Sequence, residues 1–352
     1  MTATTPSSSR RRSWLVLTLI GLVVLVAVGW AGAWVYAANR VEKEMDAWIE
    51  REAKEGRVWA CTDRALGGFP FRLELNCGTP SLTTTSGEAL LITTSSARAT
   101  AQVWSPNTIT ADFSSPARIE NKTTGEVFGA SWKTLSMSGV GDTSGRPQRF
   151  SLNASGLNVE QVQADGNTPL GSAGQLDFAT RLLPPTKEGP EDVEYNATVT
   201  GVQSPVLVAF GEKGPVDLAL AGVVTSAANL KPMPLEQRLR VWAAGQGEAR
   251  LTRFDITSPS VAVSARGIVS LDPQGQLNGN LTLGFAGFQQ LAGQLGAAGI
   301  IPGELAPMIG ALAMVGQPAD VDGRKGVSFP LSFKGGRLSL SGLPVGRVPP
   351  AF

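Results

Sequence analysis

The residues best suited to chemistry in this sequence are its two cysteines, Cys61 and Cys77. The chain contains no histidine, which removes Ser-His-Asp and Cys-His catalysis, histidine zinc sites and histidine acid–base chemistry. An isolated cysteine pair in an oxidising compartment favours a disulfide over a metal or redox site. A bridge across this short loop would contribute about 3 kcal/mol on the chain-entropy model. The pair therefore predicts a disulfide, provided that this part of the chain is exported.

Without histidine, an enzyme would have to use carboxylates such as Glu74 and Asp217, a Ser-Lys pair or a bound metal. No spacing singles out any of these residues, and solvated surface charge is the simpler interpretation of the two carboxylates. The sequence therefore predicts no catalytic residue, no metal site and no cofactor. We expect the protein not to be an enzyme.

An apolar stretch at residues 14–36 determines the compartment of these side chains. It contains no ionisable group apart from Tyr36, and as a helix rising about 1.5 Å per residue it would be roughly 34 Å long. The hydrocarbon core of a bilayer is about 30 Å thick. Trp14 at one end and Trp30, Trp34 and Tyr36 at the other suit the two headgroup boundaries. The stretch predicts a transmembrane helix.

The residues that flank this stretch predict its orientation. Arg10, Arg11 and Arg12 precede it and no acidic residue occurs before Glu42, so the positive-inside rule keeps the N-terminus in the cytoplasm. We expect a single-pass protein of the bacterial inner membrane, with residues 1–13 as a disordered cytoplasmic tail and residues 37–352 as a periplasmic β-rich domain. A cleavable signal peptide is the alternative, because residues 31–33 (Ala-Gly-Ala) have the small-x-small form of a cleavage site. Signal h-regions run to roughly 7–15 residues, which favours retention of this longer stretch.

Composition restricts the partners and the fold class. Of the 30 lysine and arginine residues, Arg10, Arg11 and Arg12 precede the apolar stretch and Arg40 lies just after it, so the rest of the exported body has fewer basic residues than its 29 acidic ones. Nucleic acid is not an expected partner. The 41 glycines, with abundant Ser and Thr and recurrent Pro, are typical of many short strands and turns.

Residues 37–56 are predicted to be a helix. Their apolar residues fall on one stripe and charged residues fill the rest of the surface. Gly56 is a plausible C-cap. The apolar stripe, which we expect to pack on a sheet, consists of Val41, Met45, Trp48, Ile49 and Ala53.

The most regular pattern in the body is residues 67–77, Gly-Gly-Phe-Pro-Phe-Arg-Leu-Glu-Leu-Asn-Cys. Apolar and polar residues alternate there, which predicts one strand with one buried face. Pro70 cannot donate to a ladder, so it marks a strand start or an edge. We expect the bridge to tie the segment after the helix to this strand. The predicted inward residues are Phe69, Phe71, Leu73, Leu75 and Cys77.

Strand patterns continue from residue 90 to residue 283 and predict a large antiparallel, curved or folded sheet. A single sheet and two stacked sheets fit the patterns equally well, and the strand order stays open. The clearest alternations are at Phe150, Leu152 and Ala154; Tyr195, Ala197 and Val199; Val216, Leu218 and Leu220; Val261, Val263 and Ala265; and Leu281, Leu283 and Phe285.

Residues 285–316 interrupt this β pattern with a predicted apolar helical hairpin. The hairpin either plugs one end of the sheet as ordinary core or forms a lid over a groove. Its apolar residues at helical spacing include Phe288, Leu291, Leu295, Leu305, Met308, Ile309 and Leu312.

Two resemblances add to these patterns. A helix-anchored chain with Gly-Phe-Pro-Phe-Arg shortly before a cysteine resembles a bacterial inner-membrane-anchored envelope family of unknown function, domain of unknown function 2125. Residues 329–340 and 344–346 also resemble the C-terminal strands of AsmA-like envelope proteins. The second resemblance implies a long folded sheet with an apolar groove for lipids.

We therefore expect a membrane-anchored periplasmic protein that binds or handles a lipid or another apolar envelope molecule in a β-sheet groove. Phe69, Phe71, Leu73, Leu75 and the helical hairpin would line that groove. The alternative is a non-catalytic scaffold with a filled core, which would dock other envelope proteins. The lipid bilayer is an expected partner under both hypotheses.

Overall fold

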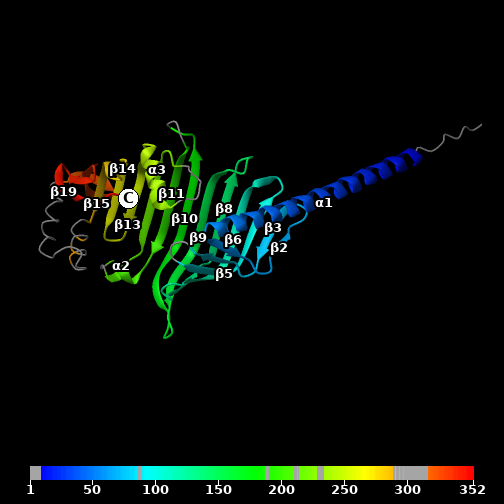
Figure 1. Ribbon diagram of the computed structural model, residues 1–352, viewed down its shortest axis with the longest axis horizontal. Coiled ribbons are helices and arrows are strands. Elements are labelled where there is room, and N and C mark those ends of the chain that lie inside the picture. The colour runs from blue at the N-terminus through cyan, green and yellow to red at the C-terminus, as the bar shows by residue number, and fades with distance from the viewer. Residues whose placement is uncertain are drawn as a thin grey trace, which may run out of the picture.

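A long helix precedes a large antiparallel sheet in this mainly β protein (Figure 1). The computed structural model describes residues 9–85, 89–186, 190–209, 212, 214–227, 234–287, 290, 293, 296 and 316–352. In those residues the helices are α1 (Ser9–Lys54), α2 (Pro205–Ala209) and α3 (Leu235–Ala244). This organisation confirms the predicted fold class.

Helix α1 is one continuous element rather than a span followed by a separate helix. No proline interrupts it, Arg51 and Lys54 complement the dipole in its last turn, and Gly56 follows with φ 78°. The predicted helix 37–56 therefore continues the predicted span and ends at Lys54. The helix also begins at Ser9, inside the predicted disordered tail 1–13.

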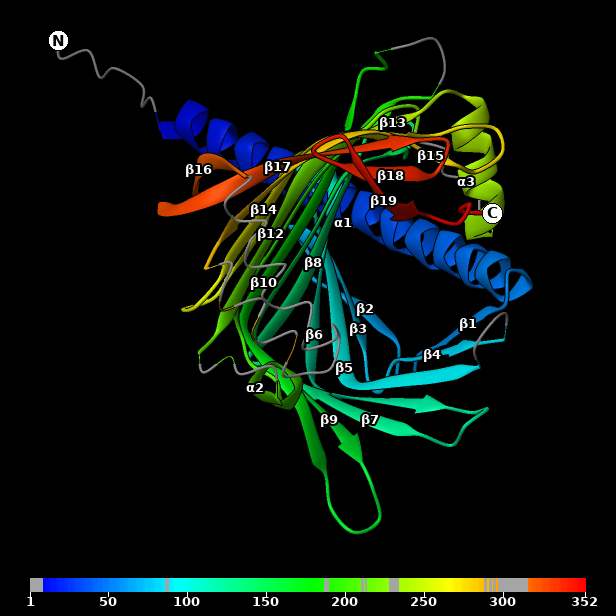
Figure 2. The same ribbon diagram turned by 90° about the vertical axis from the view of Figure 1, so that its left-hand side faces the viewer.

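Among the described residues, α1 is the one helix long and apolar enough to cross a membrane, and its apolar window is not buried in the protein. This N-terminal part of α1 projects beyond the sheet (Figure 1). The C-terminal part lies inside the curve of the sheet (Figure 2). One helix therefore extends from a fully exposed apolar segment into the body of the protein.

The sheet contains 19 strands in the described part of the chain. The strands of the first half are β1 (Arg57–Ala60), β2 (Ala65–Gly67), β3 (Arg72–Cys77), β4 (Ser81–Thr84), β5 (Leu90–Gln102), β6 (Ser105–Asn121), β7 (Val127–Ser131), β8 (Thr134–Gly141) and β9 (Pro147–Val162). Those of the second half are β10 (Thr168–Leu183), β11 (Asp192–Val202), β12 (Val216–Val224), β13 (Glu248–Thr257), β14 (Ala262–Leu271), β15 (Leu277–Ala286), β16 (Gln317–Val321), β17 (Arg324–Lys334), β18 (Arg337–Leu340) and β19 (Leu343–Arg347).

The first half of the sheet bends because its long strands each pair with two short ones. Strand β5 pairs with β4 near its start and with β3 near its end, and β6 pairs with β7 and β8 in the same way. Register shifts in β5–β6 separate the two segments at Thr94 and Ser96. Pro116 lies on β6 at this irregularity, where it has no N–H to donate. The bent strands curl the sheet around α1 (Figure 2).

The second half is a meander from β9 to β15, followed by β17, β18 and β19, all antiparallel. The alternations predicted around Phe150, Tyr195, Val216, Val263 and Leu281 all fall on these strands. One buried cluster of this half consists of Ala262, Ala286 and Val321, with Ala319 packed against it, and further buried apolar residues include Val216, Val261, Phe329 and Phe333. Most residues of these strands are half-buried or exposed rather than fully buried.

The predicted helical hairpin 285–316 is only partly described. Phe285 and Ala286 belong to β15, so the strand extends past the predicted start of the hairpin. Residues 290, 293 and 296 have helical backbone. Its predicted apolar residues lie outside the described residues: Phe288, Leu291, Leu295, Leu305, Met308, Ile309 and Leu312.

Candidate functional site

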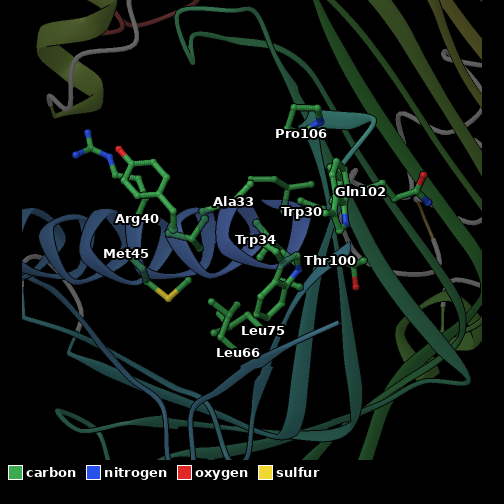
Figure 3. Close-up of a pocket in the computed structure, with 18 residues that line it drawn as sticks. Trp30, Ala33, Trp34, Arg40, Met45, Leu66, Leu75, Thr100, Gln102 and Pro106 are labelled. Carbon is green, nitrogen blue, oxygen red and sulfur yellow. The ribbon is translucent and has the colours of Figure 1, made fainter. Parts of the chain in front are cut away.

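In the described part of the chain, an apolar groove of about 520 Å³ lies between α1 and strands β2, β3, β5 and β6. We call it the α1 groove. Met45, Leu66, Leu75 and Trp34 point toward one another between the helix and the strands, whereas Arg40 points away from them (Figure 3). The helix contributes Trp30, Ala33, Trp34, Ala37, Val41 and Met45, and the sheet contributes Leu66, Leu73, Leu75, Ala99, Ala101 and Ile109.

Two tryptophans fix α1 to the turn that precedes β3. The indole Nε1 of Trp30 donates to the carbonyl oxygen of Pro70 at 2.9 Å, and that of Trp34 donates to the carbonyl oxygen of Arg72 at 3.0 Å. The ring of Trp34 also meets Phe69 edge to face, with centroids 5.7 Å apart. These contacts hold α1 against the start of β3 at one end of the α1 groove.

Polar and aromatic contacts hold the C-terminal end of α1. Arg57 donates to both carboxylate oxygens of Glu52, at 2.6 and 3.0 Å, and this hydrogen bonding holds the pKa of the Glu52 carboxyl below its usual value. Arg64 pairs with Asp46 at 2.7 Å. The helix is thus clamped to the sheet at both ends of the groove.

The remaining contacts at this end involve Trp48 and the cysteines. The ring of Trp48 packs against Trp59 of β1 with centroids 5.5 Å apart and planes tilted by 40°, so it packs the helix on the sheet as predicted. Cys61, just after β1, and Cys77, the buried last residue of β3, form the predicted disulfide with Cα atoms 5.5 Å apart. The bridge joins the strand that follows α1 to the strand that lines the groove.

The chemistry of the α1 groove is that of a hydrocarbon site. Its polar lining residues are few, namely Tyr36, Arg40, Thr100 and Gln102. Arg40 is two-thirds exposed and pairs with Glu44 at 2.7 Å. Among the described residues, no cluster of His, Cys, Asp or Glu could hold a metal ion. The arrangement can hold an apolar chain, with a guanidinium at the rim for a polar end.

The wall of the groove continues as an apolar face from β3 to β17. Residues directly opposite one another on antiparallel strands share a face, so the register identifies which side chains lie beside Leu75. One unbroken row consists of Leu75, Ala99, Ala111, Met137, Leu152, Phe178, Ala197, Leu220 and Phe254. A parallel row on the same face consists of Leu135, Ala154, Leu176, Val199, Leu218, Ile256, Val263, Phe285 and Val327.

This apolar face is only partly covered. Ile109 is 53% exposed, and Phe150 and Leu220 are each 37% exposed. Tyr195 lies on the same face, where burial raises the pKa of its hydroxyl. Its neighbour across the ladder is Gly222, at which a Cβ atom would lie 2.5 Å from the Tyr195 hydroxyl. The face therefore offers apolar surface well beyond the reach of α1.

The opposite face of the sheet is polar. Glu74 lies there, only 12% exposed, and pairs with Arg72 at 3.0 Å and Arg98 at 3.2 Å. The prediction that Glu74 is a solvated surface charge is therefore wrong. Asp217 lies on the same polar face and accepts a hydrogen bond from the Gly201 N–H. One row of this face consists of Asn76, Arg98, Asp112, Ser136, Asn153, Asp177, Thr198, Ala219, Asp255, Ser264 and Gly284.

The predicted groove residues divide into three groups. Leu73 and Leu75 line the α1 groove. Phe69 and Phe71 do not, because β3 begins only at Arg72 and these rings are 55% and 60% exposed. Gly68 has φ 97°, and the Arg72 N–H donates to its carbonyl at 3.1 Å, so a turn replaces the predicted strand start. The hairpin residues lie outside the described part of the chain.

The helix side of the groove is not evident from the sequence. Its pattern predicts Trp30 and Trp34 as headgroup anchors and Val41 and Met45 as helix-packing residues, but all four line the cavity. The apolar stripe predicted in residues 37–56 is the feature that points to Val41 and Met45, because a helix that packs its apolar stripe on a sheet can leave a cavity between the two. Ala99 and Ala101 of β5 show no sequence pattern that would identify them as groove residues.

Comparison with known proteins gives one family. A family model described as "Uncharacterized protein conserved in bacteria (DUF2125)" matches residues 34–349, which is most of the chain. No curated protein matches the sequence.

Proposed function

The chain belongs to this DUF2125 family, and we propose that it is anchored in the bacterial inner membrane by α1 and binds the hydrocarbon part of an envelope lipid in the α1 groove. The observation that carries the proposal is the apolar groove of about 520 Å³, lined on one side by the same helix that supplies the candidate span. This volume lies within the range of about 300–1,000 Å³ typical of small-molecule sites.

The half-covered apolar face extends the proposal. An acyl chain longer than the groove could continue along the row from Ala111 toward Phe178, where the sheet keeps one apolar surface. Each Å² of apolar surface that the acyl chain buries against this face contributes roughly 25 cal/mol to binding. The AsmA-like resemblance of the C-terminal strands points to the same kind of ligand, although the family match does not extend to AsmA-like proteins.

A photoactivatable phospholipid tests the binding proposal. With the full chain in nanodiscs that contain this lipid, we expect adducts on the groove-facing residues Leu75 and Ala99 as well as on the exposed apolar part of α1. Peptide mass spectrometry locates them. Adducts confined to residues 15–28 would show that the lipid contacts only the span and would refute the groove.

The proposed topology is tested separately. A reporter enzyme that is active only after export, fused after Phe352, should be active in cells. Replacing Arg10, Arg11 and Arg12 by glutamates should lower that activity, because the positive charges retain the N-terminus in the cytoplasm. A reporter that works only in its cytoplasmic form would exclude a periplasmic body.

A scaffold that docks other envelope proteins is the second candidate, and one observation favours it. In the part of the chain that the structure describes, β19 pairs only with β18, and all its residues are exposed. Leu343 and Val345 on this strand are 63% and 55% exposed. An edge of this kind can accept a further strand from a partner.

A further inference from the structure

Three exposed aromatic side chains form a patch beside α1. Phe69, Phe71 and Trp104 are 55%, 60% and 70% exposed, and outside α1 they are the described aromatic residues with more than half of their surface accessible. The rings of Phe71 and Trp104 lie 6.5 Å apart. We call these three residues the aromatic patch.

Two turns place the aromatic patch at one end of the sheet. Phe69 and Phe71 belong to the turn before β3, and Trp104 lies in the connection between β5 and β6. Arg72 pairs with Gln102 in the ladder, and the Val103 N–H donates to the carbonyl of Phe71 at 3.1 Å. Hydrogen bonds between the two turns therefore fix the backbone positions from which these rings project.

The patch lies at the level where α1 would leave a membrane. Trp30 donates to the carbonyl group of Pro70, in the turn that contains Phe69, and Trp34 donates to that of Arg72, the first residue of β3. From Trp14 to Trp34 the helix rises roughly 30 Å at about 1.5 Å per residue, which matches the hydrocarbon thickness. If Trp14 lies at one boundary, Trp34 and the ring of Phe69 packed on it lie at the other.

The chemistry of the patch suits a lipid surface. Exposed Phe and Trp rings partition to the boundary between hydrocarbon and headgroups. The guanidinium of Arg72 follows the turn and pairs with Glu74 at 3.0 Å; it is 58% exposed at the side-chain level, so its other N–H groups can meet lipid phosphates. Val103 and Pro106, which flank Trp104, also line the α1 groove, so the patch and one end of the groove adjoin.

We propose that the aromatic patch inserts into the interface of the bilayer that α1 spans, which seats the body on the membrane with one end of the α1 groove at the lipid surface. This inference rests on the proposed span but needs no bound ligand. It gives the body two attachments to the membrane, the helix and the patch.

Site-specific fluorescence in nanodiscs tests the proposal. The full chain with Trp104→Cys, its native disulfide intact, would be labelled with the environment-sensitive dye NBD and reconstituted with lipids that carry a doxyl quencher near the headgroup. We expect blue-shifted emission and loss of at least half of it to the quencher. Phe71→Cys should give the same result, so the outcome does not depend on one substitution.

Two control positions separate the possible failures. Thr124→Cys lies in the exposed turn at the opposite end of β6 and should stay unquenched, whereas Val24→Cys at the middle of the span should be quenched by a doxyl group carried near the end of the acyl chain, in a second nanodisc preparation. Quenching at Val24 without quenching at either patch position would overturn the proposed insertion of the aromatic patch and leave the proposed span intact. Absence of quenching at Val24 as well would overturn the span, and with it the proposed anchoring. Patch labels shielded from both the lipid quencher and an aqueous quencher would be buried against protein, either in the same chain or in a second copy of it, and would overturn the lipid assignment.

Discussion

Replacing Cys61 and Cys77 together by alanine is expected to lower the free energy of unfolding of the body by about 3 kcal/mol, the chain-entropy value for a loop of roughly this length. The bridge closes a loop with a sequence separation of 16 residues. It also joins β1, which follows α1, to β3, which lines the groove. Its loss should therefore loosen the frame that holds α1 on the sheet. Denaturant titration of the full chain in detergent would measure the change.

Reduction of the native protein supplies a matched control for this prediction. A reductant should destabilise the native protein by about the same amount as the double substitution and should leave the Cys61→Ala/Cys77→Ala variant unchanged. If the reductant has no effect on the stability of the native protein, the bridge either does not form or does not stabilise the fold.

The largest functional effect is expected from filling the α1 groove. Ala99 and Ala101 lie on β5 beneath the helix and line the cavity. A tryptophan at Ala99 would occupy the space that the proposed lipid chain uses. We expect the yield of lipid adducts on β3 to fall at least about tenfold, the effect of losing roughly 1.4 kcal/mol of binding free energy. Adducts on residues 15–28 should remain, because the span is unchanged.

The matched control for the groove is Ala179→Trp. Ala179 lies on β10 on the polar face of the sheet, opposite Ser151 and Asn196, so the same substitution there should leave the adducts on β3 unchanged. Overpacking costs typically about 1–3 kcal/mol, and the thermal unfolding of each variant would be measured to show that it is folded. Val41→Trp fills the groove from the helix side and gives a second variant if Ala99→Trp does not fold. Unchanged adduct yields in folded groove variants would contradict lipid binding at this site.

Local pattern predicted much of the fold correctly. The strands around Phe150, Tyr195 and Leu281 follow from alternation, because a sheet with one apolar and one polar face imposes a period of two on each strand. The same rule fails at Phe69 and Phe71, where Gly68 with φ 97° and the hydrogen bond from Arg72 to its carbonyl form a turn. Alternation cannot distinguish a strand from a short turn that also presents every second side chain.

The candidate site could be predicted only in part for a similar reason. Leu73 and Leu75 were found because their strand is regular, whereas Ala99 and Ala101 are small residues with no distinctive pattern. The helix side depends on contacts such as that between Trp30 and Pro70, which are 40 residues apart in sequence. No local pattern records such a contact.

By itself, the sequence determined that residues 14–36 form an apolar segment long enough to span a membrane, that the body is a β-sheet with alternating faces, and that the cysteines can form only one pair. These properties depend on residue type and short-range spacing. The tertiary structure alone decided which residues enclose the α1 groove and which aromatic rings remain exposed. Periodicity identifies the apolar face of an element, but the covering of that face depends on bends and cross-strand register that bring distant segments together.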